Sequence, residues 1–340
     1  MKILIATGIY PPHAGGPSYY AESLKNEFEK LGHKVTVRTF SIERHLPTGI
    51  RHLVYFFKTF PAYLFTDWTL VLDTFSVGIP IGCMRKLFGG VAILRTGGDF
   101  LWEQFVERTG KKITFTDFYN HEGEFTTRDK VIKRLTQIFL QSLTHIVFST
   151  EYQKNIWQKS YDFHTIPTSI IENQYDLSPQ QSITQKETKE FITISRPMKL
   201  KNEELLQQAF KIAQKKVPTI TLTVDHNIPR NEVMNRLRSA YAGVVVSLSE
   251  ISPNFVIELL SMGKPAIVTK ENGILNRIGS AVIAVDPLNV EEIANAIITI
   301  ADDATYLQYQ EKINQLSIRR PYSVLAKEFI VLASSFLQKH

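Results

Sequence analysis

The sequence predicts an α/β protein of two Rossmann-like domains, each built on a parallel sheet, with the two sheets facing a cleft. Short apolar runs of strand length alternate with amphipathic stretches of helical length along nearly the whole chain, which is typical of parallel sheets covered by helices. A polar stretch at 173–189 interrupts this alternation once, and the alternation then resumes. The length of 340 residues suits two domains of ordinary size.

The composition is that of a globular protein, with 44% hydrophobic and 21% charged residues. Cys83 is the single cysteine, which excludes an internal disulfide and fits a reducing compartment. The apolar run after Met1 is too short for a signal peptide, and no apolar stretch reaches the roughly 18–20 residues of a membrane helix. We therefore expect a cytoplasmic protein, with peripheral binding at the inner face of the membrane as an open alternative.

The net charge of +6 favours anionic partners. The lysines and arginines are scattered rather than gathered with aromatic residues on one element. We therefore expect no nucleic-acid binding.

The first domain opens with a strand, a loop, a helix and a second strand. The apolar run 2–7 predicts the first strand, and the proline- and glycine-rich segment 10–17 predicts a loop. A helix capped by Ser18 follows as far as Gly32, and 34–37 is the second strand. Such a unit has parallel strands joined by a right-handed crossover.

The remaining elements complete two domains. We place the first domain at 1–172, a linker at 173–189, the second domain at 190–322 and a last helix at 323–340. The other strands are predicted at 69–72, 91–94, 145–148, 191–194, 220–223, 244–247, 266–269 and 282–285. The clearest helices between them are predicted at 81–88, 130–143 and 203–215.

The most informative stretch follows the strand predicted at 244–247. Glu250 comes at the carboxyl end of this strand, where parallel sheets bind ligands. Ser252 as N-cap and Pro253 as first helical residue begin the next helix, whose free amides suit a phosphate. Glu258 lies one and a half turns further, where a carboxylate facing the sheet is costly unless it binds something. Alternatively, Glu250 is a loop charge and Glu258 lies on a solvated face.

Two cations follow the first strand of the second domain. Arg196 and Lys201 leave its carboxyl end on the same edge as Glu250. A departing nucleoside diphosphate needs positive charge, which a metal ion or fixed cations supply. There is no Asp-x-Asp and no histidine pair at ligand spacing, so we expect these cations in place of a metal, and no cofactor. A plain surface role is the alternative, and it is favoured for Lys199.

These motifs together resemble a known family. The two glutamates with seven residues between them, followed by 262–269, resemble the donor-site signature of family 4 glycosyltransferases, which have the GT-B fold. The family's arginine and lysine match Arg196 and Lys201, and its glycine loop matches Gly15 and Gly16. The resemblance covers nearly the whole chain.

The resemblance implies roles for these residues. Glu258 would bind the ribose hydroxyls, Glu250 the hydroxyls of the sugar, and Arg196 and Lys201 the diphosphate. The glycines would let the backbone approach the phosphates. The backbone amides near Ser252 to Asn254 would assist, in the stretch that contains Pro253. The last helix would cross back onto the first domain.

Asp99 is the acceptor-side candidate. It follows a glycine pair after a strand, where the family places a histidine or aspartate near the transferred sugar, and it would orient the acceptor hydroxyl or stabilise charge on the sugar. Trp102 and Glu103 are weaker acceptor-side candidates. The alternative for Asp99 is a simple turn residue.

The chain also departs from the family. Where the family has Glu-Gly-Phe-Gly, this sequence has Glu250-Ile251-Ser252-Pro253, so the donor's identity is left open.

The expected function is therefore retaining, metal-independent transfer of a sugar, of the hexosyltransferase type. The donor would be a nucleotide-diphosphate sugar and the acceptor a glycan or lipid-linked molecule, in cell-surface polysaccharide or glycoconjugate synthesis. A nucleotide-sugar epimerase and a non-catalytic nucleotide-sugar or glycan-binding relative are the alternatives. A nicotinamide dehydrogenase is not expected, since no Gly-x-Gly-x-x-Gly follows a predicted strand.

An aromatic stretch at 53–61, flanked by Arg44, Arg51 and Lys58, has two interpretations. It is favoured as a core helix beside the sheet. The alternative is an amphipathic helix that contacts an acidic membrane, as suits a lipid-linked acceptor.

Overall fold

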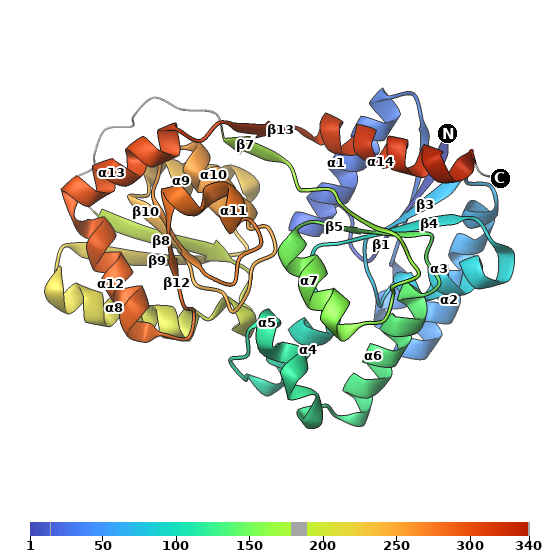
Figure 1. Cartoon of the computed structure of the whole chain (residues 1–340), viewed down its shortest axis with the longest axis horizontal. Helices are drawn as coiled ribbons and strands as arrows, with labels where there is room; N and C mark the ends of the chain where they lie inside the picture. The colour runs from blue at the N-terminus through green and yellow to red at the C-terminus, as the bar shows by residue number, and fades with distance from the viewer. Residues whose placement is uncertain (14, 178–188, 339–340) are drawn as a thin grey trace. The chain divides into compact units, whose positions relative to one another are not determined.

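The computed structural model describes residues 1–13, 15–177 and 189–338, and it divides into two compact units (Figure 1). The first unit comprises Met1–Leu101, Glu122–Gln174 and Arg320–His340. The second comprises Trp102–His121 and Tyr175–Arg319. The predicted linker at 173–189 falls largely on 178–188, which lie outside the described residues.

The first unit is built on a six-stranded parallel sheet with the order β2-β1-β3-β4-β5-β6. Its strands are β1 (Lys2–Thr7), β2 (Lys34–Thr39), β3 (Trp68–Val71), β4 (Val91–Thr96), β5 (His145–Phe148) and β6 (Thr168–Ile170). The first five confirm the predicted strands within a residue or two. The sixth is three residues long, too short to give a hydrophobic pattern.

Helices on both faces cover this sheet. They are α1 (Gly16–Lys30), α2 (Thr48–Leu64), α3 (Gly78–Phe88), α6 (Thr127–Leu140), α7 (Glu151–Ser160) and α14 (Tyr322–Leu337), with the short 3-10 helix η1 (Ile42–His45). The 3-10 helix η2 (Tyr119–Glu124) runs from the second unit into the first. As predicted, the last helix, α14, packs on the first sheet: Leu325 and Phe329 lie in one core with Phe28 and Trp68.

Helix α1 begins three residues before the predicted start, so Ser18 is not its cap. Gly15 occupies the cap position with a φ of 138°, a conformation that favours glycine. The carbonyl of Gly15 accepts the N–H groups of Ser18 and Tyr19 at 3.0 and 3.2 Å. Pro17 fits in the first turn because the amide it lacks would be unpaired there.

The second unit is built on a five-stranded sheet with the order β12-β11-β10-β8-β9, all pairs parallel. Its strands are β8 (Lys189–Ser195), β9 (Ile220–His226), β10 (Ala242–Val245), β11 (Ala266–Thr269) and β12 (Val282–Val285). The two units are therefore both Rossmann-like halves, as the sequence predicts. A small sheet of β7 (Tyr175–Leu177) and β13 (Ile318–Arg320) belongs to neither predicted pattern.

The helices of the second unit come from two parts of the chain. One part follows β8: η3 (Lys199–Lys201), α8 (Glu203–Lys216), α9 (Arg230–Ser239), α10 (Asn254–Ser261), α11 (Leu275–Ile278), η4 (Gly279–Ala281), α12 (Val290–Ala301) and α13 (Asp303–Asn314). The other is the segment 102–121, with most of α4 (Phe100–Thr109) and α5 (Phe115–Phe118). The sequence placed this segment in the first domain, because it lies between two strands of the first sheet.

Close packing of β10 against α10 depends on Gly243. A Cβ atom at this position would lie 2.4 Å from Cδ2 of Leu259 and 3.1 Å from Cε1 of Phe255. The glycine thus lets the helix that carries Glu258 lie directly on the sheet.

Within the described residues, no helix is both long enough and apolar enough to cross a membrane.

His145 of β5 is a buried histidine that links three elements. Its Nε2 lies 2.9 Å from Oγ of Ser169 in β6, and its ring contacts Phe336 of α14. Burial lowers the pKa of His145 to about 4, compared with roughly 6.5 in an unfolded chain. The unfolded chain therefore takes up the proton first, so this contribution to stability is complete above pH ~6.5 and is lost as the pH falls towards 4.

We expect His145→Gln to weaken the acid sensitivity of the fold. Between pH ~7 and ~4.5, the free energy of unfolding of the wild type should fall by on the order of 1–3 kcal/mol more than that of the variant. Urea unfolding at a series of pH values measures this difference. His164→Gln is the control, since His164 is exposed. Parallel pH profiles for wild type and His145→Gln would contradict the prediction.

Candidate functional site

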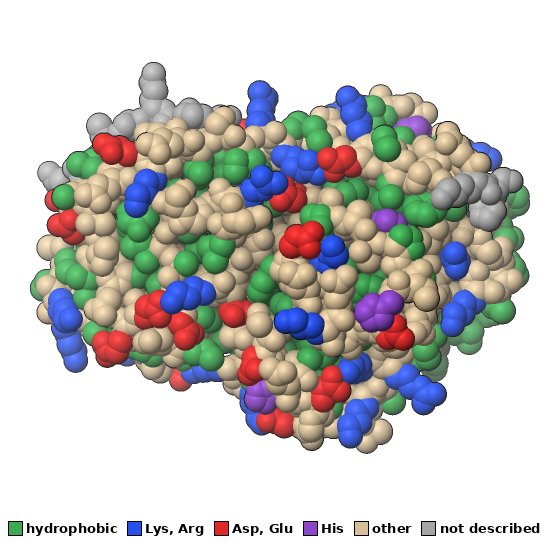
Figure 2. All heavy atoms as spheres, in the orientation of Figure 1, with side chains coloured by type: hydrophobic (Ala, Val, Ile, Leu, Met, Phe, Trp, Pro, Cys, Tyr) green, Lys and Arg blue, Asp and Glu red, His purple; other side chains and the backbone are tan. Residues whose placement is uncertain are grey.

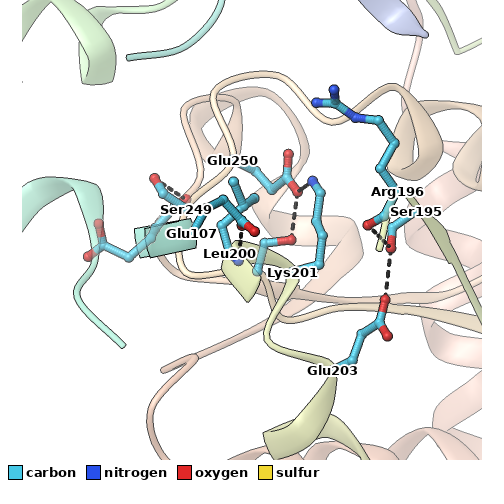
Figure 3. A network of polar contacts seen from close by, with 10 residues as sticks. Glu107, Ser195, Arg196, Leu200, Lys201, Glu203, Ser249 and Glu250 are labelled. Atoms are coloured by element: carbon cyan, nitrogen blue, oxygen red, sulfur yellow. Dashed lines mark hydrogen bonds and ion pairs between the residues drawn. The ribbon is translucent and has the colours of Figure 1, made fainter. Parts of the chain in front are cut away.

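Two loops at the carboxyl ends of β8 and β10 bring Lys201 and Glu250 into contact (Figure 3). Nζ of Lys201 lies 2.6 Å from Oε1 of Glu250, and Oγ of Ser247 donates to the same oxygen at 2.7 Å. The two strands are neighbours in a parallel sheet, so their carboxyl ends lie at one edge. The sequence predicted this convergence for Lys201 and Glu250, but not the part of Ser247.

The ion pair is shielded but accessible. The side chains of Lys201 and Glu250 are 21% and 14% exposed. Oε2 of Glu250 has no partner among the described residues, so it is available to accept a hydroxyl hydrogen bond. The ammonium of Lys201 can likewise turn towards an anion, at the expense of its bond to Glu250.

Backbone hydrogen bonds fix the position of Glu250. Its N–H donates to the carbonyl of Glu271 at 2.7 Å, and its carbonyl accepts the N–H of Gly273 at 2.9 Å. It thereby forms a parallel bridge with Asn272, in the loop after β11. The strand β10 itself ends at Val245, two residues before the predicted end, and the N–H of Leu248 then bonds to the carbonyl of Leu200 at 2.9 Å.

Asn202 connects the two loops and was not predicted. It is buried, with a left-handed φ of 58°, and stands at the start of α8 without capping it. Its Nδ2 donates to the carbonyls of Val246 at 3.1 Å and Pro287 at 2.6 Å. Asparagine is among the few non-glycine residues that adopt this backbone conformation readily. An asparagine just before a helix is usually taken as a cap, so the sequence signal pointed elsewhere.

Arg196 is exposed, and its guanidinium has no partner among the described residues. In Figure 3 its side chain extends towards the side of the loops where Lys201 and Glu250 meet. The turn beneath it is held by Glu203, which accepts the hydroxyl of Ser195 at 3.0 Å and lies 3.4 Å from His226. Glu203 and His226 were not singled out from the sequence.

Helix α10 begins one residue later than predicted. Pro253 has an extended ψ of 103° and is the cap residue, so Asn254 is the first helical residue. Ser252 is therefore not the cap, and its buried Oγ has no hydrogen bond among the described residues. Because the first amides of a helix have no partner within it, the N–H groups from Asn254 onwards are the ones offered to a ligand.

Glu258 has a partner of its own. Its Oε2 lies 2.6 Å from Nη1 of Arg230, the first residue of α9. The structure thus brings Lys201 and Glu250 together, whereas Glu258 forms a separate pair. A pair this exposed on the arginine side is weak and easily exchanged for a ligand.

The candidates of the first unit lie at the carboxyl ends of its own strands. Gly15 and Gly16 form the start of α1, and Asp99 is a buried residue directly before α4. The loop before Asp99 is held by Gln153, whose Nε2 donates to the carbonyl of Gly98 at 3.2 Å. Gln153 was not singled out from the sequence.

Asp73 is a further carboxylate at this edge that was not predicted. Its Oδ1 accepts the N–H groups of Phe75 and Ser76 at 2.9 and 2.6 Å, just after β3. A Cβ atom on Gly8, at the end of β1, would lie 3.0 Å from its Oδ2. Burial raises the pKa of Asp73.

Trp102 and Glu103 lie in the segment 102–121. Trp102 is buried, its Nε1 donates to the carbonyl of Ile113 at 3.0 Å, and its ring packs on Phe115. Trp102 thus packs within this segment, and the acceptor-side roles of Trp102 and Glu103 stay predictions.

The segment 102–121 contacts both loops of the Lys201–Glu250 pair. Oε1 of Glu107 accepts the N–H of Leu200 at 3.2 Å, directly before Lys201. The hydroxyl of Thr116 donates to the carboxylate of Glu271, whose carbonyl holds the amide of Glu250. The segment thereby supports the geometry of the pair.

We expect Glu107→Ala to destabilise the second unit, because the N–H of the buried Leu200 loses its acceptor. The loss should be about 1–3 kcal/mol, the cost of an unsatisfied buried donor. Thermal and urea unfolding measure it. Glu107→Gln keeps an acceptor oxygen and should recover most of the stability, and Gln104→Ala, at an exposed position of the same helix, is the control. Equal losses for Glu107→Ala and Gln104→Ala would refute this role of Glu107.

Among residues 1–13, 15–177 and 189–338, no group of three or more histidine, cysteine, aspartate or glutamate side chains is placed to hold a metal ion.

Comparison with known protein families gives a match in the part of the chain that contains Lys201 and Glu250. Residues 183–303 match the family model described as "Glycosyl transferases group 1". This match covers most of the second unit, including Lys201 and Glu250. No curated protein matches the sequence.

Solved structures of GT-B glycosyltransferases share the fold of the whole chain. Sucrose-phosphate synthase from Thermosynechococcus elongatus is 14% identical, with a TM-score of 0.75 and complete coverage of both chains. HepE of Anabaena, in complex with UDP and glucose, is 15% identical, with a TM-score of 0.69 over 98% of this chain and 100% of its own. WaaG, a glycosyltransferase involved in lipopolysaccharide biosynthesis, is 13% identical, with a TM-score of 0.69 over 98% and 99% of the two chains. At these identities the likeness establishes the fold alone.

Proposed function

We propose that the chain is a retaining glycosyltransferase that uses a nucleotide-diphosphate sugar. The observation that carries this proposal is the Lys201–Glu250 pair at the carboxyl ends of β8 and β10. A cation for phosphate and a carboxylate for hydroxyls, side by side, match the two halves of such a donor. The group 1 glycosyl transferase match over 183–303 supports it.

In this proposal the diphosphate replaces Glu250 as the partner of Lys201. Arg196, which has a free guanidinium on the same side, adds a second cation, and the amides at the start of α10 complete the phosphate contacts. The released carboxylate of Glu250 then accepts hydroxyls of the sugar. Glu258 exchanges Arg230 for the ribose hydroxyls.

The proposed reaction is a substitution at the anomeric carbon. The bond between this carbon and the β-phosphate oxygen breaks, and its electron pair leaves with the nucleoside diphosphate. The acceptor oxygen forms its bond on the same face, and its proton passes to the departing phosphate. Lys201 and Arg196 stabilise the negative charge that grows on the leaving group.

The first unit supplies the acceptor side of the proposal. Asp99, held by the loop that Gln153 fixes, orients the acceptor hydroxyl or stabilises positive charge on the sugar. We propose a glycan or lipid-linked acceptor, in cell-surface polysaccharide or glycoconjugate synthesis, and a cytoplasmic location that fits the single Cys83. HepE was solved with UDP and glucose, so UDP-sugars are the first donors to test.

Lys201→Ala should weaken binding of the matching nucleoside diphosphate by roughly ten- to a hundredfold. The physical reason is the loss of a charge-assisted bond worth about 1.5–3 kcal/mol. Isothermal titration of wild type and variant with a panel of nucleoside diphosphates measures the change. Lys199→Ala is the matched control, because Lys199 is an exposed lysine of the same short helix η3. Equal affinities for the two variants would remove Lys201 from the donor site.

Sugar transfer should continue after treatment with EDTA, at a rate within about twofold of the untreated protein, because fixed cations take the place of a metal. The measurement is release of nucleoside diphosphate from donor in the presence of acceptor extracts. Abolished turnover that returns on adding Mg²⁺ or Mn²⁺ would overturn the metal-independent mechanism.

Donor incubated without acceptor separates the alternative functions. An isomerised nucleotide sugar identifies an epimerase, and binding without any turnover in the presence of acceptors identifies a non-catalytic relative. Either result overturns the proposal.

A further inference from the structure

The sequence favoured helix α2 as a core helix beside the sheet, and the structure buries only one side of it. It buries Tyr55, Thr59 and Tyr63, and the hydroxyl of Tyr55 donates to the carbonyl of Arg38 at 3.0 Å. Its opposite side exposes a row of apolar residues, of which Phe57 is 65% exposed. The helix is thus firmly attached along one side and apolar along the other.

The end of α3 extends this apolar surface. The ring centroids of Phe60 in α2 and Phe88 in α3 lie 4.7 Å apart, so the two helices are in contact there. Leu87 is 69% exposed beside them, and Phe65, just after α2, is 75% exposed. We define the α2–α3 face by its exposed residues: Ile50, Leu53, Val54, Phe57, Leu64, Phe65, Leu87 and Phe88.

This concentration is unusual for a single surface. The α2–α3 face holds eight of the fifteen large hydrophobic residues that are exposed in the described structure. Figure 2 shows hydrophobic side chains along the right-hand edge of the molecule, in the region where Figure 1 labels α2 and α3. Contiguous apolar patches of this kind on a globular protein mark interaction sites.

The charged residues of helices α2 and α3 themselves are all cations. Helices α2 and α3 contain Arg51, Lys58, Arg85 and Lys86 and no aspartate or glutamate. Lys58 is paired with the buried Glu43 at 2.8 Å, whereas Lys86 is exposed and has no partner among the described residues. The face therefore offers apolar side chains with cations beside them.

We propose that the α2–α3 face binds the surface of an anionic lipid bilayer. Helix α2 lies along the surface with Leu53 and Phe57 inserted among the lipids, and the cations contact the headgroups. A second copy of the chain fits this face less well. In a two-fold dimer the same cations would meet one another with no carboxylate of α2 or α3 to neutralise them.

Sedimentation of the full chain with lipid vesicles tests this proposal. The wild type should bind vesicles of mixed phosphatidylglycerol and phosphatidylcholine, and it should bind pure phosphatidylcholine vesicles at least about tenfold more weakly. The double variant Leu53→Gln/Phe57→Gln should lose at least about tenfold of the binding to the mixed vesicles. Lys86→Glu should weaken that binding most at low salt.

The control is Leu307→Gln/Val331→Gln, which removes two exposed apolar side chains elsewhere and should bind as the wild type does. Unchanged melting temperatures establish that all variants are folded. Equal binding to neutral and anionic vesicles, or full binding by Leu53→Gln/Phe57→Gln, would overturn the proposal. So would self-association, seen by sedimentation velocity, that the same double variant abolishes. No sugar transfer is measured, so the result is independent of the proposed function.

Discussion

The arrangement of the candidate site depends on the side chain of Asn202. Its amide spans from the loop after β8 to the carbonyls of Val246 and Pro287, which lie beyond β10 and β12. Buried carbonyls in loops need donors, and a single buried amide supplies two of them here. With these loops fixed, Nζ of Lys201 lies 2.6 Å from Oε1 of Glu250.

The ion pair between Lys201 and Glu250 contributes more to the orientation of the two side chains than to the stability of the fold. A largely buried ion pair adds little net stability, since the free energy needed to remove both charges from water is about as large as the free energy of their attraction. What the pair does provide is orientation, because Ser247 holds one oxygen of Glu250 and leaves the other available. A ligand that carries both phosphate and hydroxyl groups can take over each half separately.

Both units are completed by chain from elsewhere in the sequence. Helix α14 packs on the first sheet after the second sheet is finished, and the segment 102–121 leaves the first sheet and packs in the second unit. Glu107 and Thr116 of that segment contact the neighbours of Lys201 and Glu250. In the sequence, this segment follows the loop of Asp99 directly.

The sequence by itself determined the two parallel sheets, since short apolar runs and turn residues report local backbone structure. It also placed Lys201 and Glu250 at one edge, because the carboxyl ends of neighbouring parallel strands must coincide. Only the tertiary structure decided the roles of Asn202 and Glu107, whose hydrogen-bond partners lie 44 or more residues away in the chain. It also decided that α2 exposes an apolar side: an apolar helix has the same periodicity whether its second face is covered or open, and only packing distinguishes the two.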